Sequence, residues 1–447
     1  MHRRSHPVSE QKKPNHELSA MNCPHSLEEV DLFSPGAQEH WYEAYDILHE
    51  QAPVHCIPGE GFEPGTDAFI LSKHEDIANV VRDQDRYLVV GSLALQQLIA
   101  SGEDLFEMPN IGSLFASMAS LRPNPELWRT HRQELTDPWV GPGAGRNQVM
   151  VDRVVNEWID QWIDEGEVEW ISQFAQPVPQ TVMANILGWP TADLKLLKYY
   201  GDGTVKPFVY GSKHNNILPA EETKTQFEVL DEFRQYTADL IKEKRKNPAE
   251  DMISFLTEVE YSPLKRKLHD LEINGIVYAM IIGGLETTQY AISEQVQLLI
   301  ERPRAWDEIK ADRSKLRAFT EEGMRLRSPT QGLSTRITSQ DEVFQGVKVP
   351  KGSYLHLRWA AANIDPQEWD HPLDLKLDRK AGTRHLTFSQ GARVCPGASL
   401  SRLEQMSAWK AIFDRIDRFE YAENNTFQHQ PGIMLGTLEL NLNFTEI

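Results

Sequence analysis

This chain of 447 residues is short of cysteine, of long apolar runs and of positive charge, and each shortage excludes a class of protein. Its three cysteines, Cys23, Cys56 and Cys395, are too few for a disulfide framework and lack the spacing of a zinc site. No run of roughly 18 apolar residues occurs, so we expect no membrane span. Lysine and arginine total 46 against 66 acidic residues, and the net charge of −20 disfavours general binding of nucleic acid or of an anionic membrane.

The composition allows a large folded domain. Hydrophobic residues make up 40% of the chain and charged residues 25%, which excludes a disordered protein. Residues 1–26 contain four lysines or arginines and no apolar segment, so they predict a flexible tail and not a secretory signal. We expect residues 27–447 to form a single domain of a monomeric protein in the reducing cytoplasm.

Helical periodicity dominates the sequence, and the few strand-like segments are short. Amphipathic helices are predicted at residues 39–49, 74–82, 149–164, 178–187, 226–245 and 251–259. Strands are predicted at residues 68–71, 343–349, 354–357 and 438–444. The turn at residues 349–352 separates two of these strands as a hairpin would. The predicted fold class is therefore mainly α with small β-sheets.

The longest predicted helix spans residues 270–301 and is stopped by Pro303. It would be roughly 50 Å long, and its apolar middle should lie in the centre of the fold. That middle runs into Gly283-Gly284-Leu285-Glu286-Thr287-Thr288, whose two glycines alone cost about 2 kcal/mol of helix propensity. One interpretation is a notch for helix packing with a satisfied polar pair. The other is a groove over a ligand, with Glu286 and Thr287 handling protons.

A second unusual segment, residues 388–397, reads Phe-Ser-Gln-Gly-Ala-Arg-Val-Cys-Pro-Gly and precedes a helical run. Gly391 and Gly397 flank Cys395, so backbone amides can approach a large flat ligand and the sulfur. The amino end of the following helix favours a thiolate and lowers the pKa of the thiol. Arg393 is placed to meet an anionic group. A thiolate held by amides suits an axial ligand of haem iron, whereas a small core cysteine is the alternative.

This segment resembles the haem-binding loop of the cytochrome P450 family, Phe-x-x-Gly-x-[Arg/His]-x-Cys-x-Gly, with Ser389 where the family often has glycine. Further motifs of that family follow in its order. They are Trp128-x-x-x-Arg132, Gly283-Gly284-Leu285-Glu286-Thr287, Glu322-x-x-Arg325 and Asn363-Ile364-Asp365-Pro366. The resemblance covers roughly residues 30–447. It implies the P450 fold, with haem b between the long central helix and the helix after the cysteine loop.

The resemblance implies that Cys395 is the proximal ligand of the haem iron. Phe388 would pack near the haem and the sulfur. The glycines expected at the cofactor are Gly284, Gly391 and Gly397. The residues expected to bind the haem propionates are Trp128, Arg132, Arg393 and, as the weakest match because of its distance from Glu-x-x-Arg, Arg336. Less well placed neighbours are Arg129, His131 and His385.

On the oxygen side, the resemblance assigns catalysis to Glu286 and Thr287. Thr287 would hydrogen-bond dioxygen and hold a water, while Glu286 would relay protons from solvent. Family members that use peroxide usually lack this pair, so its presence favours dioxygen as the oxidant. Elsewhere, Glu322 and Arg325 would form a buried network with Arg379 that supports the fold, and loss of either is expected to give little holoprotein.

Dioxygen chemistry needs two electrons from outside the chain. The sequence has no dinucleotide-binding fingerprint and no iron–sulfur motif, so a separate ferredoxin or flavodoxin with an NAD(P)H reductase is expected. A basic patch with Arg129, Arg132 and Arg384 could dock such a partner.

The substrate pocket would be lined by residues of about 88–122, 178–215, 280–288 and 331–335. The first stretch is rich in large apolar residues, namely Leu105, Phe106, Met108, Leu114, Phe115 and Met118, which are as typical of core as of a pocket. The 199–216 segment mixes tyrosines (Tyr199, Tyr200, Tyr210), Phe208 and glycines (Gly201, Gly203, Gly211) and predicts a mobile lid. Lys206, Lys213 and His214 could bind a carboxylate or simply belong to a solvated loop.

The function that follows is a haem-thiolate monooxygenase that hydroxylates or O-dealkylates a hydrophobic small molecule, such as a fatty acid, terpenoid, steroid or aromatic ether. The alternative is a haem-thiolate peroxygenase or a haem-binding protein without catalysis. The remaining hypothesis is an unrelated fold in which Cys395 is a buried structural thiol.

Overall fold

The computed structural model describes residues 23–89, 93, 114, 117, 119–122, 124–206, 209–213, 217–332, 335–379, 384–423 and 425–447. The helices are α1 (Trp41–Gln51), α2 (His74–Arg82), α5 (Pro125–His131), α6 (Gln148–Ile159), α7 (Pro177–Leu187), α8 (Leu194–Val205), α9 (Ala220–Lys246), α10 (Met252–Glu258), α11 (Asp270–Gly284), α12 (Glu286–Glu301), α13 (Pro303–Ala311), α14 (Leu316–Leu326), α15 (Trp359–Ala362) and α16 (Ala398–Arg415). The predicted mainly helical class is confirmed.

The strands are short and form small sheets. They are β1 (Val54–Ile57), β2 (Ala68–Leu71), β3 (Tyr87–Leu88), β4 (Glu167–Glu169), β5 (Glu260–Tyr261), β6 (Arg266–Lys267), β7 (Thr335–Thr338), β8 (Glu342–Phe344), β9 (Val347–Val349), β10 (Tyr354–Leu357), β11 (Ile416–Tyr421) and β12 (Asn441–Glu446). One sheet has the order β1-β2-β10-β7-β3 and another the order β11-β12-β4. The two pairs β5–β6 and β8–β9 complete the described strands.

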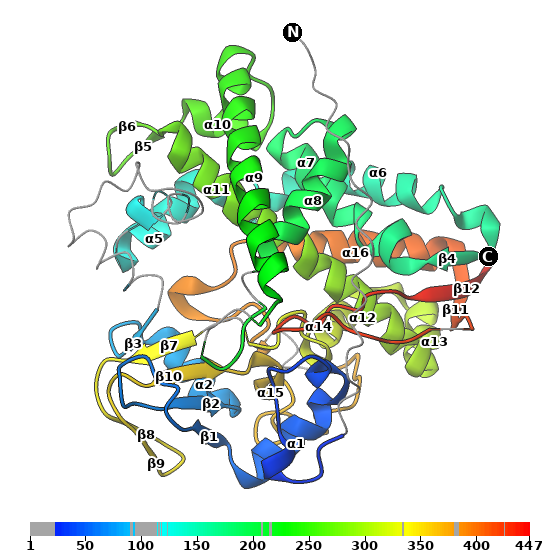
Figure 1. The fold of residues 1–447 in the computed structure, drawn as a ribbon. Helices are drawn as coiled ribbons and strands as arrows, with labels where there is room; N and C mark the ends of the chain where they lie inside the picture. Colours follow the sequence, from blue (N-terminus) through cyan, green and yellow to red (C-terminus); the bar gives the residue numbers. More distant parts are fainter. Residues whose placement is uncertain are drawn as a thin grey trace.

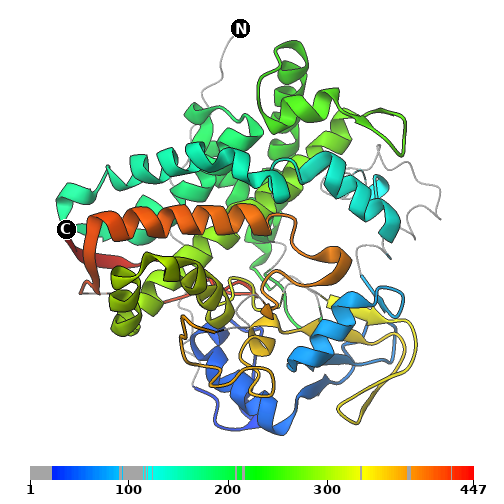
Figure 2. The ribbon, with the colours of Figure 1, turned by 180° about the vertical axis from the view of Figure 1, so that it is seen from behind.

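The helices and the largest sheet occupy different parts of the molecule. In Figure 1, α1, α2 and the five-stranded sheet lie together at the lower end, while α6–α11 form the upper part. Figure 2 shows α16 lying lengthwise between α6 and α14. The amide of Gln148 in α6 donates to Ser407 of α16 at 3.0 Å, and Trp409 of α16 meets Phe319 of α14 edge to face at 5.4 Å. The helix that follows Cys395 is therefore fixed on both sides.

The prediction of one strand at residues 343–349 is wrong. That segment is a hairpin in which β8 pairs with β9, and its turn places Gln345 and Gly346 at positive φ (48° and 80°). Two central residues at positive φ are the signature of a tight hairpin turn. The hairpin predicted around residues 349–352 is also absent from the described pairings, because β10 pairs with β2 and β7 instead.

The long central helix is broken once. α11 ends at Gly284 and α12 begins at Glu286, with Leu285 between them at φ −87° and ψ −71°. The apolar middle is buried as predicted, since Ile276 and Val277 are 1% and 0% exposed. The break therefore falls inside the Gly-Gly-Leu-Glu-Thr motif.

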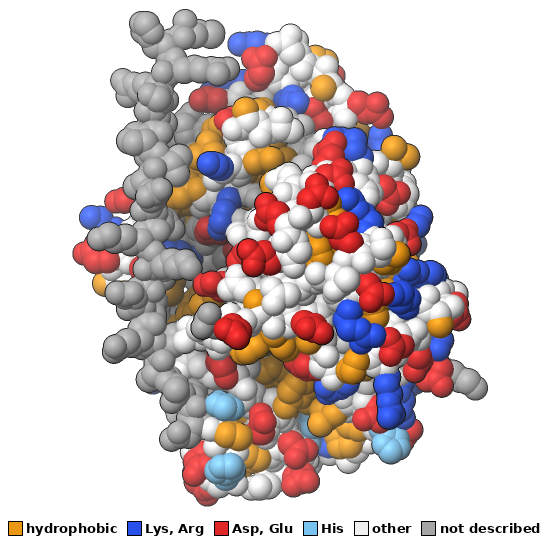
Figure 3. Space-filling view, turned by 90° about the vertical axis from the view of Figure 1, so that its right-hand side faces the viewer, with side chains coloured by type: hydrophobic (Ala, Val, Ile, Leu, Met, Phe, Trp, Pro, Cys, Tyr) orange, Lys and Arg blue, Asp and Glu red, His pale blue; other side chains and the backbone are white. Residues whose placement is uncertain are grey.

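The surface carries both signs of charge. On the face seen in Figure 3, acidic and basic side chains are interspersed. No helix within the described residues combines the length and the apolar character needed to cross a lipid bilayer.

Candidate active site

The cysteine loop is a tightly bonded turn in front of α16. The amide of Cys395 donates to the carbonyl of Phe388 at 2.8 Å, which closes the loop. Gly391 has φ +73°, and a Cβ there would lie 3.2 Å from the carbonyl oxygen of Val81 in α2. Glycine is therefore required both by the backbone angle and by the contact with α2. Ser389, at φ +57°, adopts a left-handed conformation that favours glycine, the residue expected here from the resemblance.

The sulfur of Cys395 lies beside open space. The residue is partly exposed, and a Cβ on Gly397 would meet the Sγ at 4.0 Å and no other described atom within that distance. Burial raises the pKa of the thiol, although the amides of Gly397 and Ala398 and the charges of Arg132 and Arg402 oppose this. The predicted lowering of this pKa is therefore wrong for the protein without a metal: the amides are in place, but loss of hydration outweighs them.

Phe388 packs against a hydrogen-bonded group of three residues, Arg402, Glu321 and His385. The guanidinium of Arg402 lies over its ring at 4.5 Å. Arg402 donates to Glu321 at 2.6 and 3.0 Å, and the Nε2 of His385 lies 3.0 Å from the same carboxylate. Burial raises the pKa of Glu321, but His385 and Arg402 more than reverse this and hold it at about 2. His385 thus binds Glu321 and supports the cysteine loop indirectly, through Arg402 and Phe388.

Several arginines converge beside the loop. Trp128 has the guanidinium of Arg393 over its ring at 3.5 Å and that of Arg122 at 4.4 Å. Burial, together with the charges of Arg336 and Arg122, lowers the pKa of Arg393 to about 9. Burial also lowers the pKa of Arg336 and of Arg122 to about 10. Like charges gathered at a partly buried site favour an anionic ligand.

Arg122 belongs to this cluster and was missed in the sequence. It lies outside every motif, and only its proximity to Trp128 in space reveals it. The Nε of Arg336 is buried without a hydrogen-bond partner among the described residues. Arg336 lies in β7 opposite Leu355 of β10, so the sheet fixes its direction.

Arg132 is directed at the loop backbone. It donates to the carbonyl oxygens of Val394 at 2.8 Å and Cys395 at 3.4 Å. The neighbouring His131 is 2% exposed, and burial with the charges of Arg122 and Arg132 lowers its pKa to about 3. His131 is therefore neutral at every physiological pH.

The break in the central helix separates the roles of the two glycines. A Cβ on Gly284 would lie 2.2 Å from the Cε of Met183 in α7, whereas a Cβ on Gly283 would meet nothing within 4 Å. Gly283 is exposed although Ile281 and Leu285 are buried. The structure thus supports the packing interpretation at Gly284, while the groove interpretation stays a prediction, for which Gly283 leaves space. The cofactor contact expected at Gly284 moves to Gly283 and stays a prediction.

The acid and the alcohol, which are neighbours at the start of α12, have different hydrogen-bond partners. The hydroxyl of Thr287 donates to the carbonyl of Gly283 at 2.6 Å. Glu286 is 7% exposed and accepts a hydrogen bond from the hydroxyl of Tyr290. Burial, followed by the charge of Asp202, raises the pKa of Glu286 to about 8, against the hydrogen bonds of Tyr290 and Gln430. The acid therefore keeps its proton at neutral pH.

A buried chain of hydrogen bonds joins the two halves of the site. Thr288 of α12 donates to Ser401 of α16 at 3.2 Å, and the amide of Gln405 donates to the same serine at 3.0 Å. The amide of Gln295 donates to Gln405 at 2.6 Å, and the indole of Trp409 donates to Gln295 at 2.6 Å. The helix bearing Thr287 is thereby tied to the helix that follows Cys395.

The Glu-x-x-Arg network predicted from the sequence is confirmed. Arg325, 0% exposed, donates to both oxygens of Glu322 at 2.7 and 2.9 Å. The Nε of Arg379 lies 3.1 Å from Glu322. Arg325 also donates to the carbonyl oxygens of Asn363 and Pro372. This network binds α14 to the segment before the cysteine loop.

The predicted lid is largely packed helix. Tyr199 and Tyr200 lie in α8, where Tyr200 is 4% exposed among Trp189, Phe233 and Tyr236. A Cβ on Gly201 would lie 2.8 Å from Leu285, and one on Gly203 would lie 2.4 Å from Val229. These glycines allow close helix contact, so the idea of a mobile lid is wrong for this part.

The basic residues proposed for a carboxylate substrate have acidic neighbours of their own. Lys206 lies 3.7 Å from Glu222, and Lys213 lies 3.7 Å from Glu60. The preference for an acidic substrate therefore loses its support. Of the apolar stretch, Leu114 is buried; Leu105, Phe106, Met108, Phe115 and Met118, with Phe208 and His214, lie outside the described residues.

The basic patch for a redox partner is smaller than predicted. Arg129 is exposed and Arg384 is exposed but paired with Glu368 at 2.5 Å. Arg132 faces the loop carbonyls and is partly buried.

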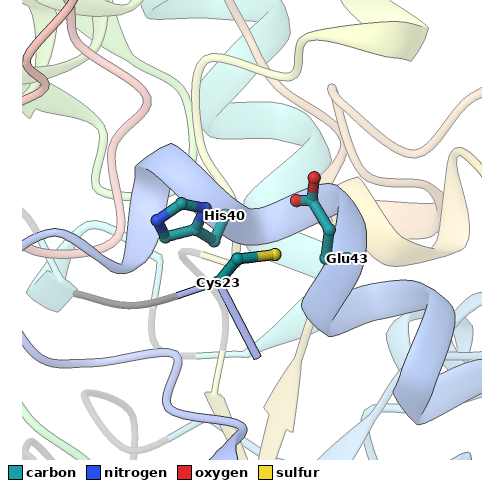
Figure 4. Close-up of side chains that lie close together, drawn as sticks. All are labelled: Cys23, His40 and Glu43. Atoms are coloured by element: carbon teal, nitrogen blue, oxygen red, sulfur yellow. The ribbon is translucent and has the colours of Figure 1, made fainter. Parts of the chain in front are cut away.

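A second cluster of ligand-type side chains lies near the start of the described chain. Cys23, His40 and Glu43 have donor atoms within 4.8 Å of one another, and Figure 4 shows the Cys23 side chain between the other two. Burial, Glu43 and Glu29 raise the pKa of the Cys23 thiol, which disfavours the thiolate form that a metal needs. Three donors, one on an exposed glutamate, are also fewer than the four of a structural zinc site.

Comparison with known proteins agrees with these features. The family model described as "Cytochrome P450" matches residues 101–444. "Polyketide biosynthesis cytochrome P450 PksS" of Bacillus subtilis (strain 168) is 23% identical over 416 residues, covering 91% of this chain and 97% of the relative. "Steroid C26-monooxygenase" of Mycolicibacterium smegmatis is 28% identical over 333 residues, covering 71% and 80%.

A solved structure is similar in fold. P450BioI, in complex with an acyl carrier protein ligated to hexadec-9Z-enoic acid, has a TM-score of 0.77 and 24% identity. The match covers 91% of this chain and 99% of that one. The resemblance seen in the sequence and the predicted fold are thus confirmed.

Proposed function

Because the chain belongs to the cytochrome P450 family of haem-dependent monooxygenases, we propose that it oxidises a hydrophobic small molecule with dioxygen and two external electrons. The reaction is hydroxylation or O-dealkylation. The observation that carries the proposal is the setting of Cys395, a sulfur beside open space with the amides of Gly397 and Ala398 directed at it.

The residues around this sulfur fit a haem group. Gly283 and Gly397 leave space where side chains would intrude. The cluster of Arg122, Arg336 and Arg393 offers positive charge, and the buried Nε of Arg336 is a donor without a partner among the described residues. A cofactor with two carboxylates matches that donor set.

Cys395 would bind the iron, and Phe388, Gly391 and Gly397 would form the wall on the thiolate side. The residues proposed for the propionates of haem b are Arg336, Arg393, Trp128 and Arg122. Arg132, which donates to the loop carbonyls, could reach a propionate only with a group that these bonds leave free. Haem held by a thiolate supplies the chemistry that splits the O–O bond and oxidises an unactivated carbon.

On the side proposed to bind dioxygen, Glu286 and Thr287 are the residues that supply protons and hydrogen bonds. A carboxyl with a pKa of about 8 is protonated at pH 7 and can donate, and Thr287 can pass a hydrogen bond across the break. This pair favours use of dioxygen over use of peroxide. The electrons are proposed to come from a ferredoxin or flavodoxin with an NAD(P)H reductase, because the sequence has no dinucleotide-binding fingerprint and no iron–sulfur motif.

The substrate class is proposed as a neutral or weakly polar hydrophobic molecule, such as a terpenoid, a steroid or a fatty acyl group. The names of the relatives point to polyketide and steroid chemistry, and the similar structure carries a fatty acyl chain. These substrates share a large apolar surface. Titrating the purified protein with testosterone, dodecanoic acid and a methoxy-aromatic, and following the haem spin state, distinguishes among them.

The absorption spectrum of the reduced protein with carbon monoxide tests the proposal. A strongly red-shifted Soret band is expected in the wild-type protein and in Cys56→Ser, and it should be lost in Cys395→Ser. A folded protein without a haem band, or a band that survives Cys395→Ser, would contradict the proposal. Product formation with hydrogen peroxide, and none with NADPH and a ferredoxin system, would favour the peroxygenase alternative.

A further inference from the structure

Two residues outside the recognised motifs hold the carboxyl group of Glu286. They are Tyr290, one helical turn later in α12, and Gln430, in the C-terminal segment 428–438. We infer that these two residues form a clamp that positions Glu286 as the proton donor of the site. The inference rests on the function proposed above and adds Tyr290 and Gln430 as positioning residues.

Tyr290 is fixed on all sides. It is 3% exposed, and its hydroxyl donates to Oε2 of Glu286. Its ring packs with Tyr210, Ile433 and Met434 in one buried cluster. A Cβ on Gly436 would lie 2.6 Å from the ring, so the backbone of the C-terminal segment presses directly on it. The hydroxyl therefore has a fixed position from which to bind the acid.

Gln430 approaches the same carboxyl from the C-terminal segment. That segment is a small hairpin: the backbone N–H of Gln430 donates to the carbonyl of Gly436 at 2.9 Å, and the backbone N–H of Leu438 donates to the carbonyl of Gln428 at 2.9 Å. The hydrogen bond from the side chain of Gln430 lowers the pKa of Glu286, as does that from Tyr290. The clamp thus joins two distant parts of the chain at one carboxyl group.

The hairpin is itself anchored two turns further along α12. The ring nitrogen Nε2 of His429 lies 3.4 Å from Glu294, and the hydroxyl of Thr437 donates to Glu294 at 2.5 Å. These contacts flank Gln430 in the hairpin. Because His429 precedes Gln430 and faces Thr437 across the hairpin, the bonds of His429 and Thr437 to Glu294 of α12 limit the positions that the side-chain amide of Gln430 can take.

The charged groups that face Glu286 lie on α8. Asp202 raises the pKa of Glu286, and Lys198 lowers it. Lys198 and Asp202 form an ion pair at 2.7 Å whose side chains are 44% and 43% exposed. Glu286 is therefore influenced by a solvent-exposed ion pair of α8 and is the chain neighbour of Thr287. A carboxyl held there can take a proton from the surface side and present it at the helix break.

Tyr290→Phe tests the clamp, with Tyr278→Phe as the matched control. Tyr278 is a buried tyrosine of α11 whose ring packs against Phe233 at 5.8 Å. The first readout is the infrared band of the protonated carboxyl, isolated as the difference from Glu286→Gln in haem-loaded full-length protein. In Tyr290→Phe this band should move in frequency, and its titration should shift to higher pH by about one pH unit, because a hydrogen bond that favours the anion is lost.

The second readout is the hydrogen peroxide released per NADPH oxidised with a plant-type ferredoxin and its reductase. It should rise several-fold in Tyr290→Phe and in Gln430→Leu and stay at the wild-type value in Tyr278→Phe. An unmoved carboxyl band together with an unchanged peroxide yield in both clamp variants would overturn the inference. Failure of the proposed function is seen separately, as a wild-type protein without the carbon monoxide band. Gln430→Leu keeps the test open if Tyr290→Phe does not fold.

Discussion

Glu286 and Glu294 lie two turns apart on the same helix, both are buried, and both are reached by the same C-terminal hairpin, yet they differ in charge. Burial raises the pKa of Glu286 to about 8, with neutral Tyr290 and Gln430 as its hydrogen-bond partners. Burial also raises the pKa of Glu294, but His429, Arg327 and Thr437 outweigh it and hold it at about 2. The difference shows that the hydrogen-bond and charge partners, and not the depth of burial, decide whether a carboxyl in this helix is protonated or ionised at neutral pH.

The two acids accordingly have different roles in the structure. Glu294 holds together Arg327 at 3.1 Å, His429 and Thr437, which come from three separate segments. Glu286 contributes no ion pair to the described structure and keeps its proton at neutral pH beside the break in the helix. One half of α12 therefore stabilises the fold, while the other carries a group whose burial costs stability and which serves the chemistry.

The largest effect is expected from removing the fixed charge. Glu294→Leu removes the buried carboxylate that Arg327 and His429 share and leaves them only the more exposed Glu301 and Glu39, so the free energy of unfolding should fall by about 3 kcal/mol. Urea denaturation at pH 7 measures this change. Glu301→Gln is the control, because Glu301 also pairs with Arg327 but is 31% exposed, and it should cost under about 1 kcal/mol. Equal losses in the two variants would contradict the comparison.

The opposite sign is expected for the other acid. In the unfolded chain Glu286 releases its proton near pH 4.5, whereas in the folded protein it does so near pH 8, so stability falls as pH rises between these values. Glu286→Gln should therefore stabilise the protein by about 3 kcal/mol at pH 7 and by almost nothing at pH 4. Denaturation curves at the two pH values check this. A gain that is the same at both pH values would mean that packing, and not ionisation, is responsible.

These two acids also show how much of the site could be predicted from the sequence. The cysteine loop, α2 and the Glu322–Arg325 pair were predictable because each signal is local, a motif or a periodicity within a dozen residues. Glu294 and His429 are 135 positions apart in the chain. Arg122 lies only six residues before Trp128, but it belongs to no motif that would have marked it. The assignment of Gly283 and Gly284 needed the position of Met183, a hundred residues earlier. In the strand predicted at 343–349, alternation hid the turn at Gln345 and Gly346.

The anchor of the hairpin should be pH-sensitive in the alkaline range. Burial lowers the pKa of His429, but Glu294 and Glu39 raise it to about 9, so its charged form stabilises the fold. That contribution is complete below the unfolded value of about 6.5 and is lost as pH rises through 9. His429→Gln should cost up to about 3 kcal/mol at pH 6 and little at pH 10. The difference in unfolding free energy between variant and wild type at these pH values is the measurement, and a constant difference would contradict it.

The smallest effect concerns the break that opens the Glu286 end of the helix. Gly283→Ala places its methyl group where no described atom lies within 4 Å, so it should raise helix stability by about 1 kcal/mol. Gly284→Ala meets the flexible end of Met183 at 2.2 Å and should cost about 1–3 kcal/mol instead. Thermal unfolding of the protein without haem measures both changes. If the space beside Gly283 is the cofactor site, the more stable variant should also take up haem less well, measured as the Soret absorbance per protein, while Gly284→Ala should differ mainly in stability. If Gly284→Ala were the variant that gains stability and loses haem uptake, the open side of the helix would lie at Gly284 and not at Gly283.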